Sequence, residues 1–145
     1  MIPVFDANGN LPPGIHVGRW DELVARFGTT PHRQKLLAGL RAALLSLKDS
    51  SCRCVYIDSS FVTAKEQPGD FDGCWDVDGV DSDKLDPVLL EFSNRRAAQK
   101  AKFHGELFLA NSAADPSGTR FIDFFQLDKD GQPKGMIALD LKDLP

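Results

Sequence analysis

Two aspartates separated by one residue, Asp70 and Asp72, have the type and spacing that suit metal chemistry. They open the segment "DFDGCWDV", which alternates like a β-strand, so both carboxylates should project from one face. Two unit negative charges about 4 Å apart repel by roughly 4 kcal/mol at an effective dielectric constant of about 20. A fold keeps such a pair when it is solvated, protonated or bridged by a cation, and carboxylate oxygens suit Mg²⁺ or Mn²⁺. The pair therefore predicts a divalent metal site, with an exposed acidic turn as the alternative.

A polar turn precedes the two aspartates. Ser59 and Ser60 follow the apolar run "CVYID", and nine residues, "FVTAKEQPG", separate them from Asp70. Small residues with available backbone N–H groups bind phosphate, and Lys65 would add a positive charge. A cation held by two carboxylates stabilises charge during in-line displacement at phosphorus. We therefore expect Ser59, Ser60 and Lys65 to bind the triphosphate of a nucleotide.

The elements that must position these residues are predicted from hydrophobic periodicity. Thr30 is a favourable N-cap and Pro31 a favourable first residue for a helix whose leucines recur on one face, so that face should cover a sheet. The expected fold is α+β (or α/β), a small mixed β-sheet with helices packed on it. The other expected helices are "WDELVARFG" and "SNRRAAQKAKF", and "RFIDFFQL" favours a helix with a strand as the alternative. The expected strands are "CRCVYID", "DFDGCWDV", "PVLLEF", an apolar segment after Gly105, and "MIALDL".

Length and composition are those of an ordinary globular domain. The 145 residues predict a single domain, 1–145, in which 1–19 form an extended N-terminal arm. The net charge of −4 argues against bulk electrostatic binding to nucleic acid. The first residues lack the basic and apolar regions of a signal peptide, and no apolar segment approaches the length of a membrane span. We expect a soluble, cytoplasmic protein with no membrane partner.

Residues 50–110 resemble the nucleotidyltransferase superfamily. Proteins of this superfamily have a Gly-Ser or Gly-Gly turn after the first strand and then Asp-x-Asp flanked by hydrophobic residues. Here "YIDSS", the nine-residue interval and "DFD" follow the same order. The chain looks most similar to the minimal prokaryotic members, many of which are encoded in toxin–antitoxin loci, and to an uncharacterised group among them with "GNLPPGIH" and "PKGMIALDL" near its ends.

The resemblance also implies a third carboxylate on the next strand, followed by a helix with basic residues, a glycine and an apolar strand. The segment "LDPVLLEFSNRRAAQKAKFHGELFLAN" is similar to that arrangement. Counting back from Gly105 assigns the third acid to Asp86, with Glu91 as the alternative. The basic stretch from Arg95 to Lys102 would be either a solvated helix face or a contact to phosphate or RNA.

The resemblance implies an enzyme that moves a nucleoside monophosphate from an NTP such as ATP to a hydroxyl of a protein or RNA. Asp70 and Asp72 would hold Mg²⁺ or Mn²⁺, and Asp86 would complete the catalytic site. Ser59 stands where the family has glycine, and this substitution favours a second hypothesis. In that alternative the chain is a catalytically inactive, nucleotidyltransferase-like antitoxin that binds a cognate toxin or another protein partner.

Overall fold

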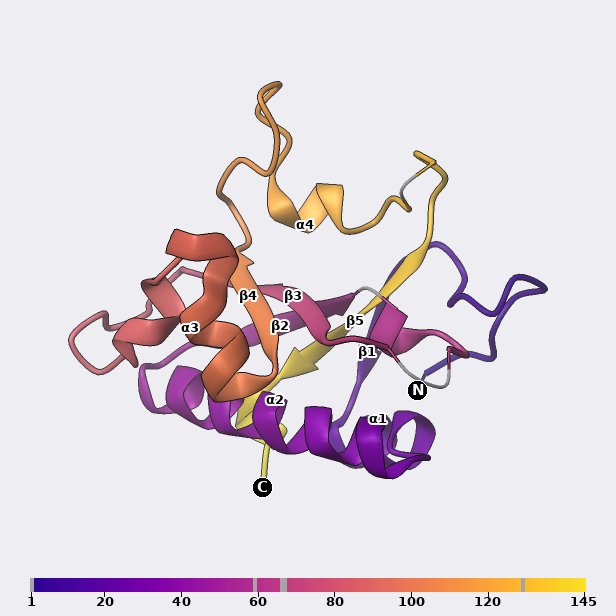
Figure 1. The fold of residues 1–145 in the computed structure, drawn as a ribbon, viewed down its shortest axis with the longest axis horizontal. Helices are drawn as coiled ribbons and strands as arrows, with labels where there is room; N and C mark the ends of the chain where they lie inside the picture. The colour runs from indigo at the N-terminus through magenta and orange to yellow at the C-terminus, as the bar shows by residue number, and fades with distance from the viewer. Residues whose placement is uncertain (1, 59, 66–67, 129) are drawn as a thin grey trace.

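A computed structural model of the chain describes residues 2–58, 60–65, 68–128 and 130–145. Its centre is a mixed sheet of five strands with helices packed on it (Figure 1), so the expected α+β class is confirmed. The strands are β1 (Gly14–Gly18), β2 (Cys54–Asp58), β3 (Phe71–Trp75), β4 (Gly105–Leu109) and β5 (Gly135–Asp140). The α-helices are α1 (Trp20–Phe27), α2 (Pro31–Asp49), α3 (Ser93–Phe103) and α4 (Phe121–Phe124). Three short 3₁₀ helices are η1 (Ser60–Val62), η2 (Pro87–Leu90) and η3 (Leu141–Asp143).

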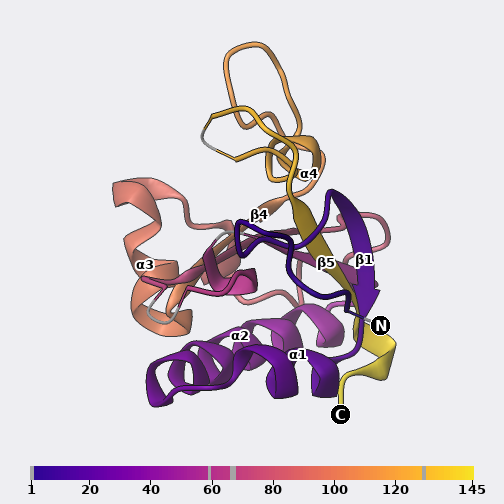
Figure 2. The ribbon, with the colours of Figure 1, turned by 90° about the vertical axis from the view of Figure 1, so that its right-hand side faces the viewer.

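The strands are ordered β1-β5-β2-β3-β4 across the sheet. Strand β2 is antiparallel to both of its neighbours, whereas β1 is parallel to β5 and β3 is parallel to β4. Helices α1 and α2 lie under one face of the sheet, and α4 with its flanking loops stands over the other face (Figure 2). Helix α3 lies beside β4 at the edge of the sheet.

Helix α2 forms where the leucine spacing predicts it. The Thr30 hydroxyl accepts a hydrogen bond from the backbone N–H of Arg33 (3.1 Å), and Pro31 is the first helical residue. The apolar face of α2 is buried against the sheet and forms the larger core together with Val55, Ile57 and Phe71. The buried apolar residues of α2 are Leu36, Leu37, Leu40, Ala43, Leu44 and Leu47.

A second, smaller core lies on the opposite face of the sheet. Cys74, Ala110, Phe125 and Met136 are buried there under α4. Phe108 and Phe121 stack beside them, with ring centroids 4.3 Å apart. This cluster fixes α4 above the middle of the sheet and leaves polar residues around its margins. Among the described residues, no helix combines the length and apolar character needed to cross a membrane.

One local expectation differs from the structure. The segment "PVLLEF" is not a strand, because the Asp86 side chain caps η2 at the backbone N–H of Val88 (3.0 Å) and Pro87 occupies the first helical position. Within the expected extended arm, 1–19, the residues Gly14–Gly18 form strand β1, which pairs in parallel with β5.

Candidate functional site

Three carboxylates lie side by side on neighbouring strands. Asp58 at the end of β2 is the register partner of Asp72 on β3, and Asp72 is the register partner of Glu106 on β4. Register partners present their side chains on the same face of a sheet. The face is the one opposite α1 and α2, because Ile57 and Leu107, the strand neighbours of Asp58 and Glu106, point into the larger core. Strand pairing therefore concentrates negative charge at one margin of the sheet face that carries α4.

Asp70, Asp72 and Glu106 form a compact acidic cluster, in which one carboxylate oxygen of each residue lies within 4.8 Å of the others. In the described part of the chain, this is the one group of three or more His, Cys, Asp or Glu side chains arranged so closely. Glu106 is buried, and Asp70 and Asp72 are partly buried. Three converging carboxylates supply the hard oxygen ligands that Mg²⁺ and Mn²⁺ prefer. The donor set therefore fits such an ion.

Electrostatics at Asp70 follow from this crowding. Burial raises the pKa of its carboxyl, and the charge of Glu106 raises the pKa further, while Lys100 acts in the opposite direction. Both raising effects disfavour the ionised carboxylate, because burial removes hydrating water and Glu106 repels a second negative charge. A bound divalent cation would reverse this preference and release the proton.

Two cations from α3 neutralise Glu106. Its Oε1 lies 2.9 Å from the Lys100 Nζ and 3.4 Å from an Arg96 guanidinium nitrogen. The backbone of Asn94, Arg95 and Arg96 is left-handed, with φ of 51°, 56° and 59°, a conformation that costs non-glycine residues energy. This strained turn at the start of α3 includes Arg96. The guanidinium carbon of Arg96 also lies 5.4 Å from the centre of the Phe108 ring. Local strain is thus retained next to the acidic cluster.

Asp58 and Lys134 form a second ion pair beside the cluster. The Lys134 Nζ lies 3.3 Å from the Asp58 Oδ1, and Asp58 is only 2% exposed. Both residues line a cavity of about 440 Å³ that also includes Asp72. Four aspartates face this cavity, and the apolar part of its wall comes from α4 and the loop that follows it. The acidic cluster therefore borders this open cavity through Asp72.

The segment between β2 and β3 is held by the beginning of α2. The buried guanidinium of Arg33 donates hydrogen bonds to the carbonyl oxygens of Phe61 (2.7 Å), Thr63 (2.9 Å) and Lys65 (3.1 Å from Nε). His32 directly precedes Arg33 in α2, and its Nε2 donates a hydrogen bond to the carbonyl oxygen of Pro68 (2.5 Å). Pro68 lies two residues before Asp70. These contacts connect helix α2 to the chain that carries the first carboxylate. The burial of Arg33 is possible because peptide oxygens satisfy its donors.

The structure does not bring the two candidates for a third carboxylate into the cluster. Asp86 is the N-cap of η2 and forms an ion pair with Lys102, and this hydrogen bond lowers the pKa of its carboxyl. Glu91 is exposed and accepts hydrogen bonds from Ser93, which lower the pKa of its carboxyl. The third acid beside Asp70 and Asp72 is Glu106 instead. Its sequence signal is a single acidic residue inside the apolar strand "GELFL", directly after Gly105.

The predicted triphosphate ligands are only partly described. Ser59 lies outside the described residues, as does the side chain of Ser60, whose backbone begins η1. The Lys65 side chain is exposed, and its carbonyl oxygen is held by Arg33. The expectation that these three residues bind phosphate remains a prediction.

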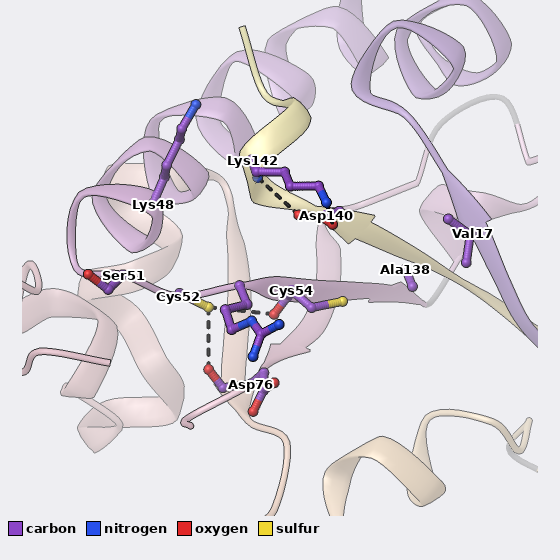
Figure 3. A pocket seen from close by; sticks show the side chains of 10 residues that line it. Val17, Lys48, Ser51, Cys52, Cys54, Asp76, Ala138, Asp140 and Lys142 are labelled. Carbon is purple, nitrogen blue, oxygen red and sulfur yellow. Dashed lines mark hydrogen bonds and ion pairs between the residues drawn. The ribbon is translucent and has the colours of Figure 1, made fainter. Parts of the chain in front are cut away.

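A larger cavity, of about 700 Å³, lies at the other end of the sheet (Figure 3). Both of its lysines have local partners, since Lys142 lies 3.6 Å from Asp140 and Lys48 donates to the Leu144 carbonyl (2.7 Å). Burial raises the pKa of the Cys52 thiol to about 11 and also raises that of Cys54, so both favour the neutral thiol, which is a poor nucleophile. This cavity offers less for catalysis than the acidic cluster.

Comparison with known proteins identifies a family without assigning a function. A family model described as "Family of unknown function (DUF6932)" matches residues 3–140, so the chain belongs to this family. No curated protein matches the chain, and neither does any solved structure.

Proposed function

We propose that the protein is a metal-dependent nucleotidyltransferase that moves a nucleoside monophosphate from an NTP to a hydroxyl of a protein or RNA. The observation that carries the proposal is the convergence of Asp70, Asp72 and Glu106, whose carboxylate oxygens lie within 4.8 Å of one another. Asp70 directly precedes β3, Asp72 lies on β3 and Glu106 lies on the neighbouring parallel strand β4, an arrangement that fits a site for Mg²⁺ or Mn²⁺.

In this reaction the acceptor oxygen forms a bond to the α-phosphorus, and the bond from that phosphorus to the pyrophosphate oxygen breaks. The hydroxyl proton passes to a carboxylate of the cluster or to water. Bound Mg²⁺ would neutralise charge on the phosphate oxygens during the displacement. Asp70, Asp72 and Glu106 would hold the ion, and the rigid pairing of β3 with β4 would keep their oxygens in position.

The second candidate is a catalytically inactive, nucleotidyltransferase-like antitoxin or partner-binding protein. The ion pairs that Lys100 and Arg96 make with Glu106 favour it, because they compensate part of the negative charge without a metal. Either role belongs in a prokaryotic cytoplasm, where NTPs, Mg²⁺ and a cognate toxin or antitoxin are available, and we propose that location.

Calorimetry tests the first proposal. ATP, GTP, CTP and UTP are titrated with and without Mg²⁺ into the wild type and into Asp70→Asn/Asp72→Asn. The matched control is Asp81→Asn/Asp83→Asn, which alters an exposed pair with the same spacing. We expect Mg²⁺-dependent binding of at least one nucleotide in the wild type and the control and its loss in the first variant. Equal binding by all three proteins would contradict the proposal.

A partner assay separates the two candidates. Genes adjacent to the one that encodes this chain are co-expressed with it, and any partner that co-purifies is then tested against Asp70→Asn/Asp72→Asn. Full partner binding by this variant, together with an absence of nucleotide binding by the wild type, would favour the inactive protein.

A further inference from the structure

A second cavity, of about 220 Å³, adjoins the acidic cluster on the side of helix α2. Asp70 belongs to both the cluster and the cavity wall. Lys100, which lies 2.9 Å from Glu106, also lines the cavity. A ligand in this space would therefore contact the same carboxylate that is proposed to hold the metal.

The wall of this cavity is basic. Helix α2 contributes His32 and Lys35, and the end of α3 contributes Lys100 and His104. Among the described wall residues, Asp70 is the acidic one. We call this space the basic cavity. Two ammonium groups and the His104 imidazole around this carboxylate favour an anion that carries several charges.

The cavity beside Asp72 has the opposite character. Among its described wall residues are four aspartates, Asp58, Asp72, Asp115 and Asp128, and one lysine, Lys134. A phosphate chain placed there would face several carboxylates at short range and would be repelled. The two cavities on either side of the cluster therefore differ in the charge of the group that each one accepts.

The size of the basic cavity also limits what it can hold. At about 220 Å³ the space has half the volume of the cavity beside Asp72, which is about 440 Å³. That volume suits a short phosphate chain better than a complete nucleotide. The hydrogen bond from the His32 Nε2 to the Pro68 carbonyl (2.5 Å) orients one wall before any ligand arrives.

We propose that the basic cavity binds the β- and γ-phosphates of the NTP and holds them as pyrophosphate after transfer, with Lys35 and Lys100 as their cationic contacts. The inference rests on the proposed function for the identity of the nucleotide, but it assigns the phosphate chain to residues outside the serine turn. When a metal ion occupies the cluster, Lys100 would leave its ion pair with Glu106 and form one with the phosphate instead. The nucleoside and the acceptor would lie toward the cavity beside Asp72.

The test uses the full chain, with inorganic pyrophosphate and ATP as probes, each titrated by calorimetry in the presence of Mg²⁺. Lys35→Glu reverses one charge of the basic cavity without touching the acidic cluster, and the side chain is exposed on α2, so the fold should persist. The control is Lys84→Glu, which makes the same charge change at an exposed site in the loop before η2. Circular dichroism and thermal unfolding verify that both variants fold.

We expect Lys35→Glu to weaken binding of both probes about tenfold or more, as loss of a hydrogen bond to a charged group would. Lys84→Glu should change neither affinity by more than about twofold, because an exposed charge far from the ligand is screened. Unchanged affinities in Lys35→Glu would overturn the assignment while leaving nucleotide binding intact. Pyrophosphate binding that depends on Lys35, without binding of any NTP, would support the anion site and reject the proposed transferase. No binding of either probe to the wild type would reject both.

Discussion

Glu106 is the direct register partner of Asp72 across the parallel pair of β3 and β4. Its position depends on the close approach of the two strands one residue earlier, where Gly105 pairs with Phe71. A Cβ at Gly105 would lie 2.5 Å from the Phe71 ring, too close for any other residue without a shift of that ring. The same backbone contact therefore places the third carboxylate beside the aspartate pair.

Replacing Glu106 and Asp86 in separate variants should show which of these two residues acts as the third acid. We expect Glu106→Gln to weaken Mg²⁺-dependent nucleotide binding by at least about tenfold, because a neutral amide loses the charge that holds the ion. The measurement is calorimetry at fixed Mg²⁺ concentration. Asp86→Asn serves as the control, because asparagine still caps η2 and the exposed ion pair with Lys102 contributes only about 0–1 kcal/mol. A larger loss in Asp86→Asn than in Glu106→Gln would restore Asp86 as the third acid.

Asp70 should make the stability of the protein depend on pH in a defined direction. The folded state raises the pKa of this carboxyl above its usual range, so the folded protein binds the proton more tightly than the unfolded chain does. The resulting stabilisation is complete below the unfolded pKa and is lost as the pH rises through the folded pKa. We therefore expect Asp70→Asn to raise the melting temperature at pH 7.5.

The difference between Asp70→Asn and the wild type should shrink as the pH falls toward about 3, below the unfolded pKa, where the Asp70 carboxyl is mostly protonated in both states. Thermal unfolding at several pH values, without divalent metal, measures it. Asp81→Asn is the control at an exposed aspartate of the loop that precedes η2. A melting temperature of Asp70→Asn that stays below that of the wild type at pH 7.5 would contradict the electrostatic account.

Much of the framework was predictable because it depends on local signals. Thr30, Pro31 and the leucines of α2 determine the main helix, and alternation predicts β2 and β3. Both aspartates of the acidic pair were identified by their spacing alone. Strand β1 was missed because "GIHVG" has two glycines and exposed side chains, and its pairing with β5 lies more than a hundred residues away in sequence.

The third carboxylate was not predictable by spacing, because strand pairing between distant segments decides which acid meets Asp72. Asp86 is nearer to the pair in sequence, but its side chain caps η2 and points its charge toward Lys102. Glu106 lies beside Asp72 because β4 pairs in parallel with β3 in this register. No local sequence pattern specifies that register. The basic cavity likewise joins residues of α2 and α3 that only tertiary packing brings together.

Arg33 should contribute to stability through the peptide oxygens that it holds. Replacing it with lysine keeps the charge, but a single ammonium cannot reach the carbonyls of Phe61, Thr63 and Lys65 together. A buried carbonyl left without a donor costs about 1–3 kcal/mol, and the Phe61 carbonyl is buried, so we expect Arg33→Lys to lower the free energy of unfolding by about 2 kcal/mol. Urea denaturation measures this change.

Arg41→Lys on the same helix is the matched control, since Arg41 donates to the exposed Pro145 carbonyl (2.7 Å) and its loss should cost less than about 1 kcal/mol. If Arg33→Lys and Arg41→Lys had equal effects, the buried guanidinium would not be what holds the segment before Asp70.

At the left-handed turn at the start of α3, we expect a substitution that stabilises the protein, in contrast to Arg33→Lys. Arg95 is exposed and has φ of 56°, a conformation that costs L-residues roughly 1–2 kcal/mol and costs glycine little. We expect Arg95→Gly to raise the free energy of unfolding by about 1 kcal/mol, measured by urea denaturation. Ala101→Gly, in the right-handed part of the same helix, should lower it by about 1 kcal/mol. If both substitutions destabilised the protein equally, residues 94–96 would not hold a left-handed backbone in solution, and the route by which Arg96 reaches Glu106 would have to be different.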